Sequence, residues 1–255
     1  MTLLLASLLF AQIAAPATLA DDRLRICMSQ ARNDPATAIG TANAWLEEAV
    51  EVERSYPRQC LGFAYTSLLR WEAARDAFVN ARDVRAAADF TGRARLGGMA
   101  GNAAIAAEDF GGALAILDAA QADALAGGRA QLAGTIAADR ARAFVGLEQD
   151  EQATAALENA REWAPQVADV WLLSATLARR MNDLASAQAH IRTANLLAPQ
   201  NAAIGLEAGL IAALSGDDTA ARTAWQSVIA VDREAPEAAT ARAYLAQLEE
   251  GNTSP

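Results

Sequence analysis

The sequence predicts an all-α protein built from repeated pairs of helices, and three observations carry this prediction. Alanine dominates the 53% of residues that are apolar, and aromatic residues make up only 5%. Because alanine is the strongest helix former, this composition favours closely packed helices. Only 7 of the 255 residues are proline, which leaves long stretches free to be helical. Matching patterns that recur with a period of about 34 residues then indicate a repeat array.

The repeat is clearest between Pro165 and Pro199, which stand one full period apart. Within this unit Ala187, Ile191 and Ala194 share one face of a helix, since residues three and four apart are neighbours on a helix surface. A polar break precedes this helix, so each unit is interpreted as helix, short turn, helix. The same face recurs one period before and one period after, at Ala153, Leu157, Ala160, Ala221, Trp225 and Val228.

The first 20 residues differ from the rest, because they carry no charged side chain and contain an apolar core. Small residues follow at Ala15, Ala17 and Ala20, just before a charged segment. This pattern predicts a secretory signal peptide over residues 1–20, cleaved after Ala20 or alternatively after Ala17. An uncleaved membrane anchor is the other interpretation, since about 18–20 apolar residues can span a bilayer. Export would place the protein in the periplasm or outside the cell.

The charge pattern excludes several function classes. The net charge is −10, and all 21 basic residues are arginine, with no lysine in the chain. P-loop nucleotide binding, pyridoxal Schiff-base chemistry and protein-kinase chemistry each need a lysine. Nucleic acid is not an expected partner, because phosphate binding needs clustered cations and this acidic chain has no basic run.

The second unit carries a motif. In the segment CLGFAY, Leu61 and Gly62 precede Tyr65 in the pattern Leu-Gly-x-x-Tyr, and Trp71 and Phe78 follow at helical spacing. Together with the closing prolines, these residues resemble the tetratricopeptide repeat (TPR) family. The resemblance implies a right-handed superhelical solenoid of antiparallel helix pairs that acts as a protein-binding scaffold.

The repeat register divides the chain into five to six units. Extra residues near 89–93 and 128–133 predict kinks or longer helices. The glycines of GGMAGN and FGGA predict that the third unit is the loosest. In the degenerate first unit, Asp34 and Pro35 form an expected helix start. The predicted helical domain covers 21–250, with units at 21–54, 55–88, 94–127, 134–167, 168–201 and 202–235, a capping helix at 236–250 and a disordered tail at 251–255.

The two cysteines fit this register. Cys27 and Cys60 are separated by almost one full period, so they occupy nearly equivalent places on the first helices of adjacent units. Such helices are neighbours in a solenoid, and we expect a disulfide that stabilises the fold by about 2–4 kcal/mol. Two buried free thiols are the alternative.

The resemblance also implies a binding surface, because the first helices of successive repeats line a concave groove. The residues projected into it are apolar apart from a few polar ones and the arginines, which bind carboxylates in a bidentate manner. We therefore expect a protein or peptide partner with apolar anchors and a carboxylate. The alternative is that these side chains only pack or pair with acidic neighbours. The predicted groove residues are Phe63, Asn102, Ile105, Arg142, Val145, Leu172, Thr176, Arg179, Leu206 and Leu210.

Catalysis is not expected, although one alternative remains. His190 is the only histidine, so a metal motif with two histidines is excluded, and the chain lacks Cys-x-x-Cys and Gly-x-Ser-x-Gly. No cofactor or metal is predicted. A hydrolase that uses His190 would need a serine and a carboxylate within reach. His190 does not recur at the repeat period, where Ala156 and Ala224 stand instead.

Overall fold

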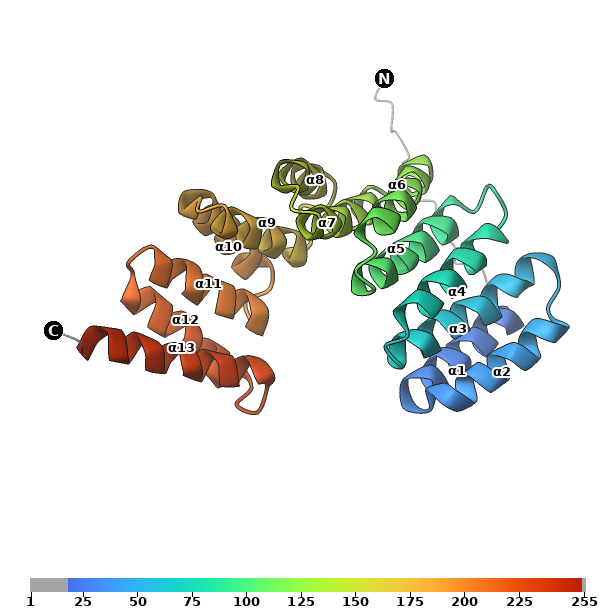
Figure 1. Cartoon of the computed structure of the whole chain (residues 1–255), viewed down its shortest axis with the longest axis horizontal. Helices are drawn as coiled ribbons and strands as arrows, with labels where there is room; N and C mark the ends of the chain where they lie inside the picture. Colours follow the sequence, from blue (N-terminus) through green and yellow to red (C-terminus); the bar gives the residue numbers. More distant parts are fainter. Residues whose placement is uncertain (1–17, 254–255) are drawn as a thin grey trace, which may run out of the picture.

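The computed structural model describes residues 18–253 and shows an array of α-helices in that range (Figure 1). The predicted signal peptide lies almost entirely outside these residues. Within the described chain, no helix is both long and apolar enough to cross a membrane. The α-helices are α1 (Leu19–Asn33), α2 (Pro35–Glu48), α3 (Ser55–Ser67), α4 (Trp71–Asp83), α5 (Phe90–Ala106), α6 (Phe110–Ala126), α7 (Ala130–Gly146), α8 (Asp150–Trp163), α9 (Ala168–Arg180), α10 (Leu184–Leu197), α11 (Ala202–Leu214), α12 (Asp218–Val231) and α13 (Pro236–Thr253).

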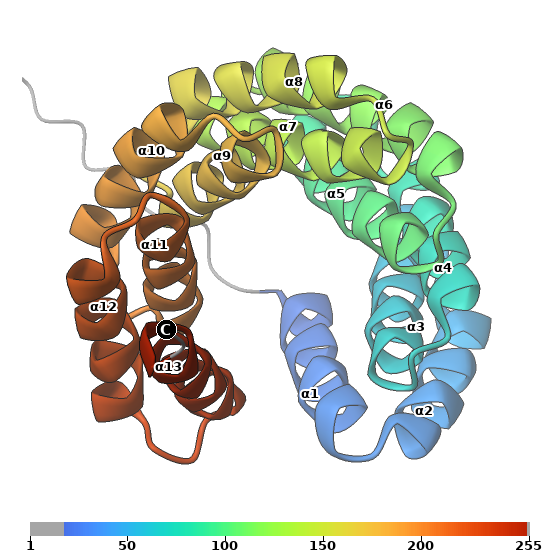
Figure 2. The same cartoon turned by 60° about the vertical axis from the view of Figure 1, so that its left-hand side comes forward.

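The helices form two curved layers. Figure 2 shows the odd-numbered helices along the inside of an arc and the even-numbered helices along its outside. The helices α1 and α13 face each other across the opening of the arc. The all-α solenoid predicted from the sequence is confirmed.

The recurring helix face forms the core. In α10, Ala187 and Ala194 are fully buried and Ile191 is 6% exposed. The corresponding residues of α4, α6, α8 and α12 are also buried. Small residues allow the two helices of a pair to approach, and the bulky residue fills the space between them. In the second unit, a Cβ atom at Gly62 would collide with the ring of Phe78, which explains the glycine of the Leu-Gly-x-x-Tyr pattern.

The repeat period is longer in the middle of the chain than near its C-terminal end. A residue with positive φ precedes the second helix of each of these units, at Glu108, Glu148, Asn182 and Gly216. The interval from Glu108 to Glu148 is longer than the two later intervals, which are equal to each other. The helices α5, α6 and α7 each have 17 residues. The extra residues therefore lengthen helices, so that α5 begins at Phe90 and α7 at Ala130.

The expectation that glycines loosen the third unit is wrong. Gly97 and Gly101 in α5 are buried against α6, and a Cβ atom at Gly97 would lie 2.7 Å from Cβ of Ala120. These glycines therefore permit a close approach, and α5 and α6 form the most extensive helix contact among the described residues. Among consecutive helices, the contact between α8 and α9 is the sparsest.

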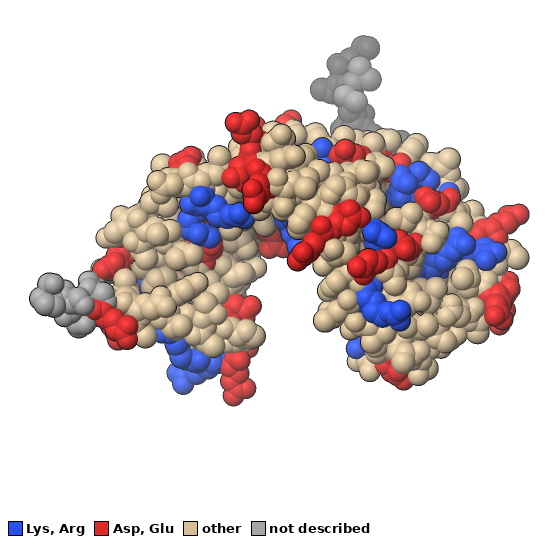
Figure 3. All heavy atoms as spheres, viewed as in Figure 1, with Lys and Arg blue, Asp and Glu red and all other residues tan. Residues whose placement is uncertain are grey.

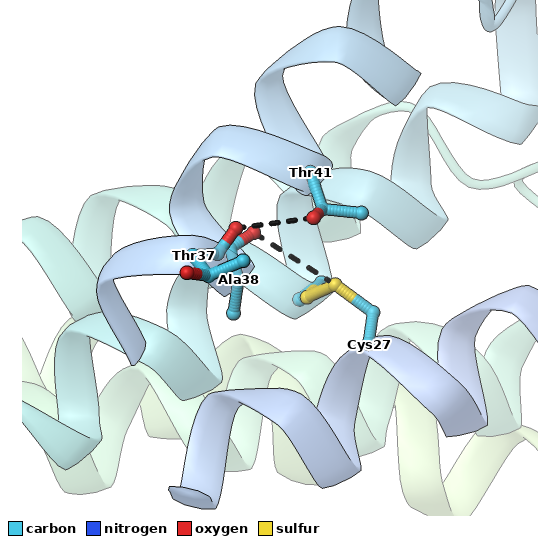
Figure 4. Close-up of a disulfide and its surroundings, with 5 residues drawn as sticks. Cys27, Thr37, Ala38 and Thr41 are labelled. Atoms are coloured by element: carbon cyan, nitrogen blue, oxygen red, sulfur yellow. Dashed lines mark hydrogen bonds between the residues drawn. A yellow bond between two sulfur atoms is a disulfide. The ribbon is translucent and has the colours of Figure 1, made fainter. Parts of the chain in front are cut away.

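The N-terminal repeat is joined to the next one by a disulfide between Cys27 in α1 and Cys60 in α3 (Figure 4). Their Cα atoms lie 6.0 Å apart, and both residues are buried. Ala38 of α2 covers the bond, with its carbonyl oxygen 4.0 Å from Sγ of Cys27. The predicted pairing is present in the structure, and it covalently connects the degenerate unit to the array.

The two ends of the array show how its helices are terminated. Asp34 accepts a hydrogen bond from the backbone N–H of Thr37, and Pro35 is the first residue of α2, as expected. At the other end, α13 runs to Thr253, so residues 251–253 continue the helix instead of forming the expected disordered tail. No proline lies between Pro236 and Pro255, so no residue of this stretch lacks the backbone N–H that a helix needs.

Candidate functional site: the concave groove

The predicted groove residues lie on the inner helices α3, α5, α7, α9 and α11. Arg142 is exposed, and the other nine are half-buried. Ile105, Leu172 and Leu206 also contact the apolar core, so part of their surface serves packing. The helices that carry the set form the inside of the arc (Figure 2).

Two apolar cavities open at equivalent places between inner helices. The first cavity, of about 210 Å³, lies between α3 and α5 and is lined by Phe63, Thr66, Met99 and Asn102, among others. A T-shaped contact between the rings of Phe63 and Phe78, with centroids 5.4 Å apart, forms one wall. Such cavities suit apolar side chains of a partner.

The second cavity, of about 190 Å³, lies between α7 and α9. Arg142, Val145 and Thr176 line it, together with Leu173 and Leu177. Counted from the ends of their helices, Arg142 and Val145 occupy the positions that Phe63 and Thr66 occupy in α3. The two cavities are therefore the same structural site, repeated two units apart.

A polar network lies between the two cavities. Asn102 donates a hydrogen bond to Asp139 at 2.8 Å, and Arg142 donates to Asn102 at 3.1 Å. Arg142 also contacts Asp139, with Nη1 3.3 Å from Oδ1. Burial raises the pKa of Asp139, whereas these two hydrogen-bonding partners oppose the rise. The network fixes the orientation of Arg142 while leaving about half of its side chain exposed.

The second predicted arginine is already paired. Arg179 contacts Glu207 of α11 through two hydrogen bonds, from Nε to Oε1 at 2.7 Å and from Nη2 to Oε2 at 3.3 Å. Both side chains are mostly buried, at 20% and 12% exposure. This is the bidentate geometry expected for a ligand carboxylate, but the chain supplies the carboxylate itself. For Arg179, the structure therefore shows the alternative given in the sequence analysis, in which the arginine pairs with an acidic residue of the chain.

Two other arginines face the groove and were missed by the sequence analysis. Arg95 of α5 and Arg129, just before α7, line an open cavity of about 320 Å³ together with Thr91 and Thr135. Arg129 donates to the hydroxyl of Thr91 at 3.2 Å. Neither arginine forms an ion pair with a carboxylate among the described residues. Arg129 lies before the predicted unit 134–167, because α7 begins earlier than predicted. Arg95 lies at the start of the predicted unit 94–127 and is not one of the projected groove positions.

His190 lies on α10, outside the concave groove. It borders a cavity between α8, α9 and α10 that also contains Ser174, Ser186 and Asp183. Burial lowers the pKa of His190, the charge of Arg161 lowers it further, and Asp183 opposes the shift. Among the described residues, no hydrogen bond joins His190 to a serine or a carboxylate, which is the contact that a hydrolytic triad requires.

The charged side chains of the surface are mixed. On the face drawn in Figure 3, acidic and basic side chains are interspersed rather than gathered into one large basic area. Among the described residues, no group of three or more His, Cys, Asp or Glu side chains is arranged to hold a metal ion.

Comparisons with known proteins identify the fold. No family model matches the chain, and no curated protein matches it. Among solved structures, the type IV pilus biogenesis factor PilW is similar, with a TM-score of 0.69, 16% identity, and coverage of 88% of this chain and 99% of PilW. PilF of Pseudomonas aeruginosa gives a TM-score of 0.66 at 15% identity, covering 89% of this chain and 97% of PilF.

A third similar structure is the apo form of the quorum sensor NprR from B. thuringiensis. Its TM-score is 0.69 at 12% identity, and the match covers 92% of this chain and 71% of NprR. PilF and PilW are TPR proteins. The TPR fold that the repeat pattern predicted is therefore confirmed.

Proposed function

We propose that this protein is an exported, non-catalytic scaffold whose concave groove binds an extended peptide segment of a partner protein. The observation that carries the proposal is the pair of equivalent apolar cavities along the inner helices, one between α3 and α5 and one between α7 and α9. An extended peptide that crosses the groove can place one apolar side chain in each cavity. The fold alone does not define the partner.

The polar groups between and beside the cavities define the remaining chemistry. Arg142 keeps half of its side chain exposed beside the second cavity. Arg95 and Arg129 offer two further guanidinium groups at the end of the groove formed by the first turns of α5 and α7. A peptide with two apolar anchors and an acidic residue satisfies all of these groups. Arg179 is not part of this proposal, because Glu207 occupies it.

Export is supported by three observations. The N-terminal segment has the composition of a secretory signal peptide. The disulfide between Cys27 and Cys60 persists in oxidising compartments and is rare in the cytosol. A similar structure, PilW, is described as a type IV pilus biogenesis factor. We propose that this chain acts in the bacterial periplasm. The alternative of a membrane-anchored protein differs only in whether the N-terminal segment is retained.

The groove can be tested with a phage-displayed library of random ten-residue peptides. We expect enrichment of sequences with two apolar residues and an acidic residue. Fluorescence anisotropy then measures the affinity of a synthetic peptide with a selected sequence. A charge in either cavity, as in Val145→Glu or Met99→Glu, should weaken binding at least tenfold, because the apolar anchor must then share its cavity with a carboxylate. Arg95→Glu combined with Arg129→Glu should weaken the preference for acidic residues, because, of the three arginines in the proposal, only Arg142 then remains to bind a carboxylate.

The matched control is Ala230→Glu, which places the same charge on the exposed outer surface of α12. It should bind peptide as the unchanged protein does. The proposal fails if the library gives no enrichment, or if the two cavity variants bind the selected peptide as tightly as the control.

A further inference from the structure

The outer surface of the solenoid contains two equivalent grooves that differ in charge pairing. One groove lies between the outer helices α4 and α6, over α5, and the other lies between α8 and α10, over α9. Arg82 and Arg161 are each the twelfth residue of their helix, in α4 and α8. They therefore occupy the same place in the two grooves.

In the first groove, the arginine is neutralised by the chain itself. Arg82 contacts Asp123 of α6 at 2.6 Å, and their side chains are only 16% and 14% exposed. Nearer the start of the same two helices, Arg75 of α4 contacts Asp109, the residue before α6, at 3.1 Å. Ile116, the seventh residue of α6, stands between these two acidic residues in the helix. Asp123 also contacts Arg93 of α5 at 3.5 Å, so ion pairs and an apolar side chain fill the groove.

In the second groove, the corresponding acidic residue is missing. The fourteenth residue of α6 is Asp123, and the fourteenth residue of α10 is Leu197. Arg161 forms no ion pair with a carboxylate of the described residues. Its hydrogen bond goes to the buried hydroxyl of Ser174, at 2.8 Å. Burial lowers the pKa of Arg161, and Glu158 opposes the shift. A half-buried guanidinium without a counter-ion is costly in a folded protein.

The second groove contains a cavity of about 350 Å³, at the place where ion pairs and Ile116 fill the first groove. Its volume is within the range of small-molecule sites. His190, the seventh residue of α10, borders the cavity at the position of Ile116. The ring of Trp171 lies 5.7 Å from the ring of His190 and 5.9 Å from the guanidinium carbon of Arg161. Leu157, Leu177 and Met181 supply apolar lining.

We infer that this outer cavity binds the α-carboxylate of an apolar amino acid, either free or at the C-terminus of a peptide. The ligand carboxylate takes the place that Asp123 holds in the equivalent groove and neutralises Arg161, while the apolar side chain contacts Leu157 and Leu177. Glu158 and Asp183 also line the cavity, and their charge disfavours dianions such as phosphate. The site opens on the outer side of α9, opposite the concave groove, and shares only Leu157 and Leu177 with the inner cavity. It does not depend on the function proposed for the groove.

The only histidine of the chain provides a direct reporter of this site. In the full chain without a histidine tag, the Cε1–H NMR signal of His190 is a single resonance. We expect N-acetyl-L-leucine, added up to about 50 mM, to shift this signal in a saturable manner, as a ligand of millimolar affinity does. N-acetyl-L-leucinamide, which lacks the carboxylate, should leave the signal unshifted. Free L-leucine distinguishes the sources: binding as tight as that of the acetylated acid indicates a free amino acid, and weaker binding indicates a peptide C-terminus.

Ligand binding should also change the titration of His190. The bound carboxylate offsets the charge of Arg161, so the pKa of His190 should rise toward or above its ordinary value. Besides Arg161, the ionisable groups lining the cavity are Glu158 of α8 and Asp183 at the start of α10, and α9 contributes none. A saturable shift of the signal with an upward change in this pKa therefore supports a carboxylate beside Arg161.

Two variants separate binding from folding. Arg161→Gln should weaken binding of N-acetyl-L-leucine about tenfold or more, the loss expected for a charge-assisted hydrogen bond, while circular dichroism stays helical. Arg192→Gln, an exposed arginine on the same helix as His190, should bind as the unchanged chain does. The inference is overturned if the amide shifts the signal as the acid does, if inorganic phosphate binds more tightly than the acid, if no saturable shift occurs, or if Arg161→Gln binds normally.

Discussion

The repeats around α5 and α6 and the repeats around α8, α9 and α10 follow one plan but pack differently. In the first region, glycines bring α5 against α6, and Arg82 is paired with Asp123. In the second region, the contact between α8 and α9 is sparse, and cavities flank α9 on its inner and outer sides. Leu157 and Leu177 line both of these cavities. The tightest helix packing and the outer cavity therefore lie in different repeats of one solenoid.

The largest expected difference is in the free energy of unfolding, between a variant that breaks the pair of Arg82 with Asp123 and one that removes the unpaired Arg161. Asp123→Asn should lower the free energy of unfolding by about 2–3 kcal/mol, because it removes the buried carboxylate that pairs with Arg82 and Arg93 and leaves Arg82 only the exposed Asp83, at 3.7 Å. Arg161→Met should change it by less than about 0.5 kcal/mol or raise it, because this variant removes an unpaired charge. Urea denaturation followed by circular dichroism measures both values. An equal loss in the two variants would mean that the grooves do not differ.

A smaller effect is expected when the same substitution is made at equivalent alanines. Ala104 and Ala178 are each the third residue from the end of α5 and α9. Ala104 is fully buried, so Ala104→Leu should cost about 1–3 kcal/mol through overpacking. Ala178 borders the outer cavity, so Ala178→Leu should be neutral or stabilise by about 0.5 kcal/mol. Thermal unfolding of both variants tests this, and a large loss for Ala178→Leu would show that the cavity is already filled.

Two neighbouring glycines of α5, Gly97 and Gly98, test whether close packing against another helix requires glycine. Gly97→Ala should destabilise by about 1–2 kcal/mol, because its Cβ atom would collide with Ala120. Gly98 meets Ile136 only at 3.6 Å, so Gly98→Ala should stabilise by about 0.5–1 kcal/mol through helix propensity. The midpoints of urea denaturation report both changes. The same sign for both variants would contradict the packing explanation.

The smallest expected effect is a pH dependence in the second region. The pKa of His190 is lowered in the folded protein, so the unfolded chain binds more protons once the pH falls below about 6.5. Stability should therefore decrease as the pH falls from about 7.5 to about 5, and this decrease should be smaller in His190→Gln. The difference in unfolding free energy between the two proteins at both pH values is the measurement. A difference that does not change with pH would contradict the lowered pKa.

The sequence predicts most of the fold because the repeat is local. Ala187, Ile191 and Ala194 identify a buried face through their spacing alone, and the register of Cys27 and Cys60 predicts their disulfide. The role of Gly97 could not be predicted, because a glycine loosens or tightens a helix pair according to what faces it. Here it faces Ala120 of α6, a contact that only the folded structure defines.

The candidate sites are less predictable than the core. The ten groove residues follow from the repeat register, and the structure places them on the inner helices. The pairing of Arg179 with Glu207 depends on side chains of two separate helices that happen to meet. The outer cavity beside Arg161 exists because its groove lacks an acidic residue: Leu197 occupies the position that Asp123 has in the equivalent groove. A comparison of equivalent positions in different repeats is the signal that could have found it.

Hydrogen exchange measured by mass spectrometry tests the central comparison most directly. In the free protein, we expect slow exchange in residues 97–120 of α5 and α6 and faster exchange in residues 157–178, because α8 and α9 contact each other sparsely. Adding a peptide selected for the groove should slow exchange in residues 142–178 and leave residues 110–120 of α6 unchanged. Equal protection of both regions in the free protein would contradict the difference in packing between them, and peptide protection confined to the outer helices would contradict binding in the concave groove.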